Sequence, residues 1–150
     1  MRGLRYLPTD RKHPVTASAD ALALVAVTAR AAADKLADDI VAFDVSDQLV
    51  ITDAFVICSA SNDRQVVAIV DAIEERARIE LGQKPVRREG DRDARWVLLD
   101  FVDVVVHVQH VEERVYYSLE RIWRDCPVIA LPADVVAGAG SGPRAIGGMR

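Results

Sequence analysis

The segment Ala94–His110, ARWVLLDFVDVVVHVQH, is the most informative part of the sequence for the fold. It consists of two largely apolar runs on either side of Phe101-Val102, and the second run is rich in β-branched valine. Two such runs around a two-residue connection predict an antiparallel hairpin. Asp100 and Asp103 flank that connection. The stretch therefore raises a functional question: the two aspartates are either a catalytic pair or part of a turn on a binding surface.

The segments on either side of this hairpin predict a mixed sheet covered by helices. Helical spacing of apolar residues predicts helices at 18–36, 62–82 and 112–124. Runs of β-branched residues predict strands at 39–45, 49–51, 54–59, 96–100 and 103–109, and 85–88 is a candidate edge strand. The order α-β-β-α-β-β-α predicts a single α/β domain, with a mixed sheet of about five strands and three flanking helices.

The helix ends and faces carry further signals. Ser18 is a candidate N-cap of the first helix, and Asn62 with Gln65 forms a capping-box pattern at the start of the second. Gly82 is placed to end the second helix. The expected buried faces are Leu22, Val25, Ala29, Ala32 and Leu36 in the first helix, Val66, Ile69, Val70, Ile73 and Ala77 in the second, and Val115, Leu119 and Ile122 in the third.

The charge is divided unevenly along the 150 residues. Residues 1–14 carry a net charge of +3 and residues 127–150 carry +1. Because the whole chain has a net charge of −4, residues 15–126 carry −8. An acidic body argues against a dedicated nucleic-acid surface, which would need a broad basic footprint. It is compatible with a basic protein partner, although plain solubility is the more ordinary explanation of an acidic surface.

The chain divides into one domain and two expected tails. Residues 1–14 lack periodicity and are expected to be a disordered leader or a start-site extension, and 133–150 form a Gly-rich segment with a disordered composition. The domain is expected at 15–132. The widely spaced Cys58 and Cys126, and the lack of an apolar run of roughly 18 residues, favour a cytoplasmic protein that spans no membrane.

The residues that could carry chemistry give weak patterns. His107 and His110 are three apart on a strand and point to opposite faces, so they are poor metal co-ligands. Asp100 and Asp103 could act as an acid–base pair, but aspartates also commonly form turns. Glycine-rich phosphate loops and strand-borne D-x-D motifs are absent from the sequence. We therefore expect no metal, cofactor or catalytic residue, while a small enzyme for a nucleotide or phosphorylated metabolite, using both aspartates and His107, remains the alternative.

Trp96 begins the first strand of the hairpin, with Leu98 and Asp100 alternating on its face. A tryptophan in this position is either a core residue or an aromatic anchor with an acidic rim, the type of residue that dominates protein interfaces. The residues alone leave both interpretations open.

Two long stretches closely resemble the ribosomal silencing factors, also called the Iojap-related family. They are ITDAFVICSASNDRQVVAIVDAIEE at 51–75 and REGDRDARWVLLDFVDVVVHVQHVEERVYYSLERIW at 88–123, within a resemblance that covers about 18–127. The combination is specific: I-T-D before an aromatic strand, R-Q-V opening a helix, E-G before W-V-L-L-D, then V-V-V-H-V and a final Y-x-L-E-R-I-W segment.

The resemblance implies a translation repressor rather than an enzyme. Family members bind the large ribosomal subunit through a small basic ribosomal protein at the intersubunit face, and they sterically block joining of the small subunit in starvation or stationary phase. Free members often form homodimers. Carried onto this sequence, the resemblance makes Trp96, Leu98, Asp100 and Asp103 candidates for the ribosomal-protein interface, and it gives the acidic body a basic partner.

The sequence departs from the family pattern at two places. The family usually has glycine where this chain has Val102, and valine resists positive φ. The turn must therefore use negative φ at Val102 or carry strain. A family segment similar to T-G-T-S reads Ser59-Ala60-Ser61-Asn62 here, which keeps its small, polar character without the glycine.

Overall fold

The computed structural model describes residues 16–90 and 92–135. Along the chain, the elements follow the order α-β-β-α-β-β-β-α-α. The elements are α1 (Ala19–Asp34), β1 (Asp38–Asp44), β2 (Ala54–Ala60), α2 (Asp63–Leu81), β3 (Arg87–Glu89), β4 (Trp96–Asp100), β5 (Val104–His110), α3 (Val111–Tyr117) and α4 (Leu119–Ile122).

The five strands form one mixed sheet in the order β1-β2-β5-β4-β3. The central pair, β2 and β5, is parallel, whereas the pairs β1–β2, β4–β5 and β3–β4 are antiparallel. Parallel β2 and β5 require a crossover, and α2 lies within it. The mixed sheet and the hairpin of β4 and β5 confirm the predicted fold class.

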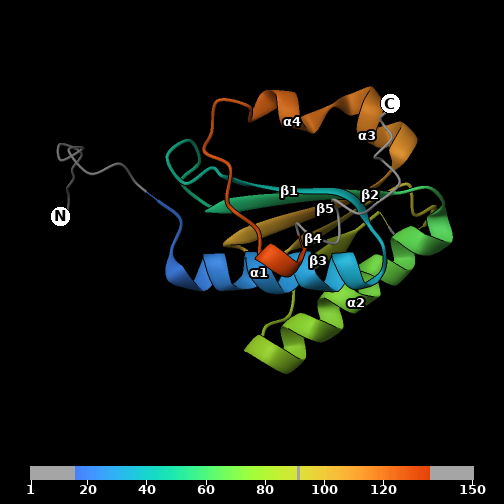
Figure 1. Cartoon of the computed structure of the whole chain (residues 1–150), viewed down its shortest axis with the longest axis horizontal. Coiled ribbons are helices and arrows are strands. Elements are labelled where there is room, and N and C mark those ends of the chain that lie inside the picture. The colour runs from blue at the N-terminus through green and yellow to red at the C-terminus, as the bar shows by residue number, and fades with distance from the viewer. Residues whose placement is uncertain (1–15, 91, 136–150) are drawn as a thin grey trace.

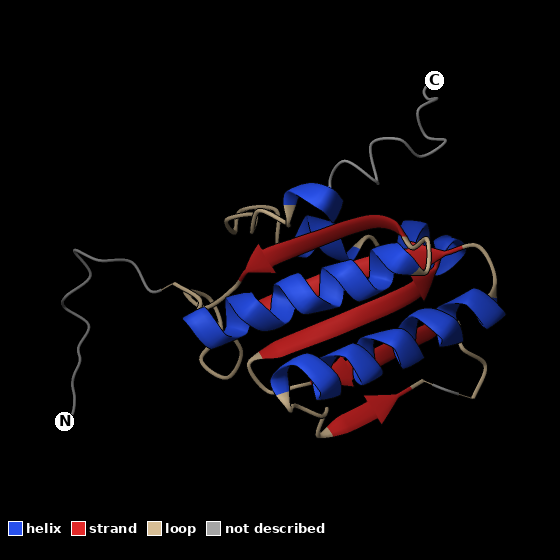
Figure 2. Cartoon of the chain, turned by 60° about the horizontal axis from the view of Figure 1, so that its bottom comes forward, coloured by secondary structure: helices blue, strands red, loops and turns tan. Residues whose placement is uncertain are grey.

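Helices α1 and α2 cover one face of the sheet, and α3 and α4 lie over the other (Figure 1). Figure 2 shows α1 and α2 side by side along the strands. Their apolar sides meet apolar side chains of the sheet, among them Val56, Val106 and Leu99, in the main core. On the other face, Phe43, Ile57 and Cys126 form a smaller cluster. The short α3 and α4 leave part of that face open over β4.

The residues that cap α1 and α2 are those that the sequence predicts, except that Gln65 has a different role. The side chain of Ser18 accepts a hydrogen bond from the backbone N–H of Ala21, and that of Asn62 accepts one from Gln65. Gly82 ends α2 in the left-handed conformation. The side chain of Gln65 does not close a capping box: its amide donates to the carbonyl oxygens at the end of α1. Gln65 therefore ties the two helices together.

Two expected elements are different in the structure. Residues 49–51 are not a strand but part of the connection between β1 and β2, in which Val50 is fully exposed. The expected helix 112–124 is broken at Ser118, which has a φ of +47, into α3 and α4. Its expected apolar face fails as well, because Val115 and Ile122 are 76% and 63% exposed. In α1, Val25, Ala29 and Ala32 are buried as expected, whereas Leu22 and Leu36 are exposed.

The expected tails fall mostly outside the described residues. This applies to all of 1–14 and to 136–150. At the start of the expected C-terminal tail, Val135 is only 3% exposed, and Asp134 lies 3.7 Å from Arg30 of α1. Asp134 and Val135 are therefore part of the described fold.

Candidate protein-binding surface

The candidate surface lies on β4, whose side chains alternate between the two faces of the sheet. Val97 and Leu99 are buried in the main core. Trp96, Leu98 and Asp100 point to the opposite face and are half-buried. We call these three residues the β4 row. Because they alternate along one strand, they present an aromatic, an aliphatic and an acidic side chain in a line.

Trp96 is fixed by side chains from two other elements. Its indole Nε1 donates a hydrogen bond of 3.1 Å to Nδ1 of His107 on β5. Its ring lies 4.8 Å, between centroids, from that of Tyr117 on α3. Ring contacts continue from His107 to Phe55 and from Phe55 to Trp123. The indole is thus held in one orientation while part of the side chain stays exposed, which is the arrangement of an interface anchor.

His107 supports this arrangement as a neutral side chain. It is 7% exposed, and burial lowers its pKa to about 4. Since Nδ1 accepts from Trp96, the imidazole proton lies on Nε2. His110 has a separate role, because its side chain accepts a hydrogen bond from the backbone N–H of Glu112 and caps α3. Within residues 16–90 and 92–135, no group of three or more candidate ligands is arranged to hold a metal ion.

Asp100 forms the turn and also joins β4 to β3. Its Oδ1 accepts a hydrogen bond of 2.8 Å from the backbone N–H of Val102. Its Oδ2 accepts one of 2.9 Å from the guanidinium of Arg87. Val102 has a φ of +76. The turn therefore adopts the strained conformation with positive φ, and not the one with negative φ.

Asp103 lies where the turn meets the connection between β1 and β2. Its backbone carbonyl accepts hydrogen bonds from the N–H groups of Asp53 and Ala54, at 2.8 and 3.1 Å. Its side chain is exposed. The sequence therefore placed Asp100 and Asp103 correctly around one turn, and the structure shows in addition that the turn is tied to a second loop.

The geometry gives little support to the alternative enzyme. Both carboxylate oxygens of Asp100 and Nδ1 of His107 are already engaged by neighbouring groups. In the sheet, His107 is paired with Leu98 rather than with Asp100. Burial raises the pKa of Cys58 to about 12, so its thiol remains protonated and unreactive at neutral pH. Asp100 and His107 therefore hold the turn and the indole of Trp96 in place.

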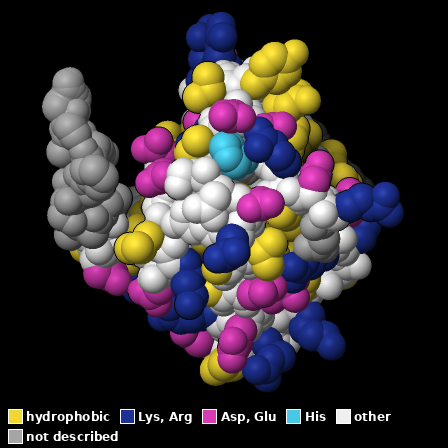
Figure 3. All heavy atoms as spheres, turned by 90° about the vertical axis from the view of Figure 1, so that its right-hand side faces the viewer, with side chains coloured by type: hydrophobic (Ala, Val, Ile, Leu, Met, Phe, Trp, Pro, Cys, Tyr) yellow, Lys and Arg dark blue, Asp and Glu magenta, His cyan; other side chains and the backbone are white. Residues whose placement is uncertain are grey.

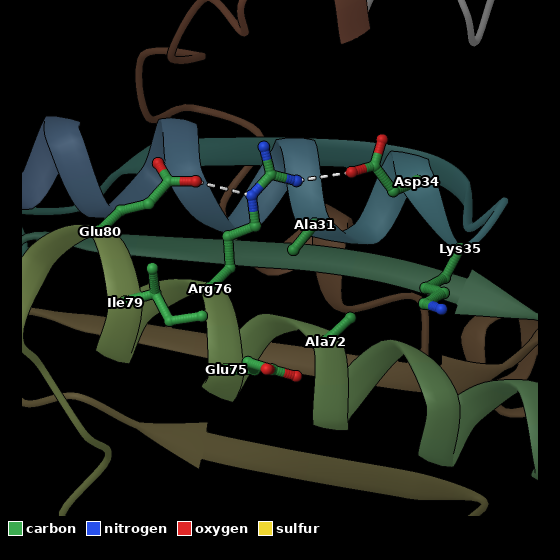
Figure 4. A pocket seen from close by; sticks show the side chains of 8 residues that line it. All are labelled: Ala31, Asp34, Lys35, Ala72, Glu75, Arg76, Ile79 and Glu80. Carbon is green, nitrogen blue, oxygen red and sulfur yellow. Dashed lines mark hydrogen bonds and ion pairs between the residues drawn. The ribbon is translucent and has the colours of Figure 1, made fainter.

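A cavity of about 310 Å³ lies on the other side of the molecule, between α1 and α2. Figure 4 shows Ala31 and Ala72 between the helices, with Arg76 reaching toward both Asp34 and Glu80. Because both carboxylates engage its guanidinium, Arg76 joins the two helices and is not free to hold an anion. This cavity is a helix junction and not the candidate site.

Exposed apolar side chains gather where α3 lies. Figure 3 shows hydrophobic side chains near the top of the end view, and acidic and basic side chains interspersed below them. Val115, Tyr116 and Tyr117 of α3 are 76%, 80% and 49% exposed. Since Tyr117 also touches Trp96, these side chains adjoin the β4 row. None of the helices in the described part of the chain is long and apolar enough to span a bilayer.

Known proteins share both this sequence pattern and this fold. A family model described as "Ribosomal silencing factor during starvation" matches residues 18–144. The chain belongs to the ribosomal silencing factor family. The "Ribosomal silencing factor RsfS" of Bacillus subtilis is 44% identical over 108 residues, which are 72% of this chain and 91% of that protein. The chloroplastic Iojap protein of Zea mays is 32% identical over 130 residues, covering 85% of this chain and 55% of that protein.

Solved structures agree with this assignment. A crystal structure of a protein from Bacillus halodurans has a TM-score of 0.63 at 39% identity, and the match covers 73% of this chain and 98% of that one. A crystal structure of a protein from Chromobacterium violaceum has a TM-score of 0.64 at 30% identity, and the match covers 67% of this chain and 83% of that one. The family recognised from its motifs and the predicted fold class are therefore confirmed. The family match also continues past residue 127, where the recognised resemblance ended.

Sequence reasoning missed the residues that support the β4 row. The sequence suggested Trp96 as an anchor but did not reveal His107 as its hydrogen-bond acceptor or Tyr117 as its aromatic neighbour. The available signal was alternation within the hairpin, which places Trp96, Leu98 and His107 on one face. Tyr117 depends on how α3 folds back over the sheet, and its position gives no comparable signal.

Proposed function

We propose that this silencing factor binds the large ribosomal subunit through a small basic ribosomal protein at the intersubunit face. Bound there, it sterically blocks joining of the small subunit and represses translation, mainly in starvation or stationary phase. Family membership supports ribosome association. We assign the contact to the β4 row and to Asp103, and we assign no catalytic step to any residue.

The observation that carries this assignment is the fixed, partly exposed indole of Trp96. An aromatic side chain that is oriented before binding loses little conformational entropy when a partner covers it. Leu98 adds apolar surface beside it, and Asp100 adds a carboxylate at the end of the row. Buried aromatic anchors of this kind supply most of the affinity at protein interfaces.

Charge supports a basic partner. Residues 15–126 carry a net charge of −8, which raises the rate of encounter with a basic surface and orients it. Asp100 is already paired with Arg87, but that guanidinium side chain is 63% exposed. A partner lysine or arginine would therefore share or replace Arg87 at little cost, because exposed ion pairs are weak.

For the free protein we propose a cytoplasmic homodimer. The exposed Val115 and Tyr116 of α3 form an apolar surface that a second copy would remove from water. The measurement is sedimentation velocity over a range of protein concentrations. Conversion of parent dimer to monomer by Tyr116→Ser supports this surface, and an unchanged dimer or a monomeric parent contradicts it.

A subunit-joining assay tests the proposed function. Purified large and small subunits are mixed with increasing amounts of the protein, and complete ribosomes are measured on a gradient. We expect loss of complete ribosomes together with one-to-one sedimentation of the protein with large subunits. Undiminished joining at saturating protein contradicts the proposal, and stoichiometric nucleotide binding with turnover would favour the alternative enzyme.

Asp100→Asn separates charge from shape in the same assay. Asparagine retains a side-chain oxygen that can accept the Val102 N–H, so the turn is preserved. If Asp100 meets a basic partner, the variant should bind large subunits more weakly and with a smaller salt dependence. Glu75→Gln, on the outer side of α2, is the matched control and should bind like the parent.

A further inference from the structure

The turn between β4 and β5 holds a valine in a conformation that disfavours valine. The backbone N–H of Asp103 donates to the carbonyl of Phe101 at 3.0 Å, so the hydrogen bond spans Val102 alone. With a φ of +76 at Val102, this is a γ-turn of the strained type. A β-branched residue is an outlier at such a φ, whereas glycine adopts it without a steric penalty.

Burial of Val102 does not compensate for this strain. The neighbouring Phe101 is 6% exposed and belongs to the main core, but Val102 is 50% exposed. The hydrogen bonds of the turn use only the backbone of Val102, so glycine would make them equally well. The fold therefore gains little from the isopropyl group, and glycine would relieve the strain at this φ. Strain that persists without a benefit to folding is characteristic of functional positions.

The turn is connected rigidly to the β4 row. Oδ1 of Asp100, the last residue of that row, accepts the Val102 N–H at 2.8 Å. On the other side, the carbonyl of Asp103 accepts the N–H of Asp53, which fixes the turn against the connection between β1 and β2. Val102 is thus an apolar side chain with an aspartate at each flank, held beyond the end of the row.

We propose that Val102 is a specificity-determining contact with the partner that binds the β4 row. This inference rests on the proposed function, because it takes that partner to be a basic protein of the large subunit. The strained turn holds the isopropyl group outward, where it meets an apolar side chain flanked by lysine or arginine. Asp100 and Asp103 supply the complementary charge beside it.

The test compares Val102→Gly and Val102→Ala with the parent in melting temperature and in affinity for purified large subunits. Glycine removes both the strain and the side chain, so the melting temperature should rise by roughly 4 °C or more. Its affinity should fall by about fivefold or more, since an apolar contact is lost. The Val102→Ala variant should lose a similar share of affinity for large subunits, and its melting temperature should rise by less. Ile79→Ala, an exposed aliphatic on α2, is the control and should bind like the parent.

The outcomes separate this inference from the proposed function. If Val102→Gly binds within twofold of the parent while Trp96→Ala does not, Val102 is not a contact and only this inference is wrong. A Val102→Gly protein that melts at or below the parent temperature contradicts the strain, and an equal loss in Ile79→Ala contradicts the specificity. If the parent itself does not bind large subunits, the proposed function is wrong as well.

Discussion

The hydrogen bond from Trp96 Nε1 to His107 Nδ1, 3.1 Å long, requires a neutral imidazole. A protonated ring would carry an N–H at Nδ1, and two donors would then face each other. The orientation of the proposed anchor therefore depends on the protonation state of a buried histidine on the neighbouring strand. This dependence gives the domain a specific response to acid.

The unfolding free energy should decrease as the pH falls from about 6.5 to about 4. The pKa of His107 is about 4 in the fold and about 6.5 in the unfolded chain, so only the unfolded chain takes up the proton in this window. Stability from this group is complete above pH 6.5, and about 3 kcal/mol is lost by pH 4. Denaturant unfolding at a series of pH values measures this change in the unfolding free energy. His107→Gln should flatten that part of the profile, whereas the control His110→Asn should not. A His107→Gln profile parallel to that of the parent would contradict the assignment.

Arg114 should be the residue whose loss frees α3 and α4 from the sheet. Its side chain donates to Glu120 on α4, to Ser59 on β2 and to the carbonyl of Asp39 on β1, and the residue is only 8% exposed. Arg114→Met should lower the unfolding free energy by about 3 kcal/mol, because buried acceptors lose their donor. Arg121→Met, at an exposed position on α4, is the control. Equal stability of the two variants in urea would show that Arg114 does not anchor the helices.

Gly90 should tolerate no side chain, because the backbone of Trp96 is too close. A Cβ at Gly90 would lie 2.0 Å from the carbonyl oxygen of Trp96, and its φ is +93. Gly90→Ala should displace the start of β4 and cost about 3 kcal/mol. Gly82→Ala is the matched control: its φ is +64 but nothing lies within 4 Å, so it should cost only about 1 kcal/mol. Thermal unfolding compares them, and equal costs would exclude the steric effect.

Removal of residues 1–14 should leave stability unchanged, whereas removal of 1–18 should not. The first anchors of α1 are the N–H of Ala17, which donates to Asp44, and the N–H of Ser18, which donates to Asp53. The longer truncation removes both anchors and the Ser18 cap, which should cost about 1–2 kcal/mol. Melting temperatures of the two truncated proteins test this. A large loss in the shorter truncation would assign residues 1–14 a structural role.

The sequence predicted the fold well wherever local pattern and tertiary environment agree. The apolar runs at β4 and β5 form the strands that the sequence predicts, and Asn62 and Gly82 mark the ends of α2. The pattern failed at 49–51, where the apolar Leu49, Val50 and Ile51 lie in a loop. Side-chain type alone cannot distinguish such a loop from a strand, because the difference lies in which backbone groups find a partner.

The candidate site was predictable only in part, for a similar reason. Trp96, Leu98 and Asp100 were identified from alternation and resemblance, and all three lie on one face. The expected apolar face of the third helix was wrong because Arg114 binds the sheet and Ser118 breaks the helix. These are long-range contacts that helical periodicity does not encode.

The affinity of Trp96→Ala for purified large subunits, measured beside its unfolding free energy, decides whether the β4 row binds the ribosome. If Trp96 is the anchor of the proposed interface, the variant should stay folded in buffer and lose roughly 2 kcal/mol of binding free energy, about thirtyfold in Kd. Its unfolding free energy should fall by less than the 3–5 kcal/mol typical of a fully buried tryptophan. A folded Trp96→Ala protein that binds large subunits as tightly as the parent would contradict the assignment of the β4 row as the ribosome-facing surface.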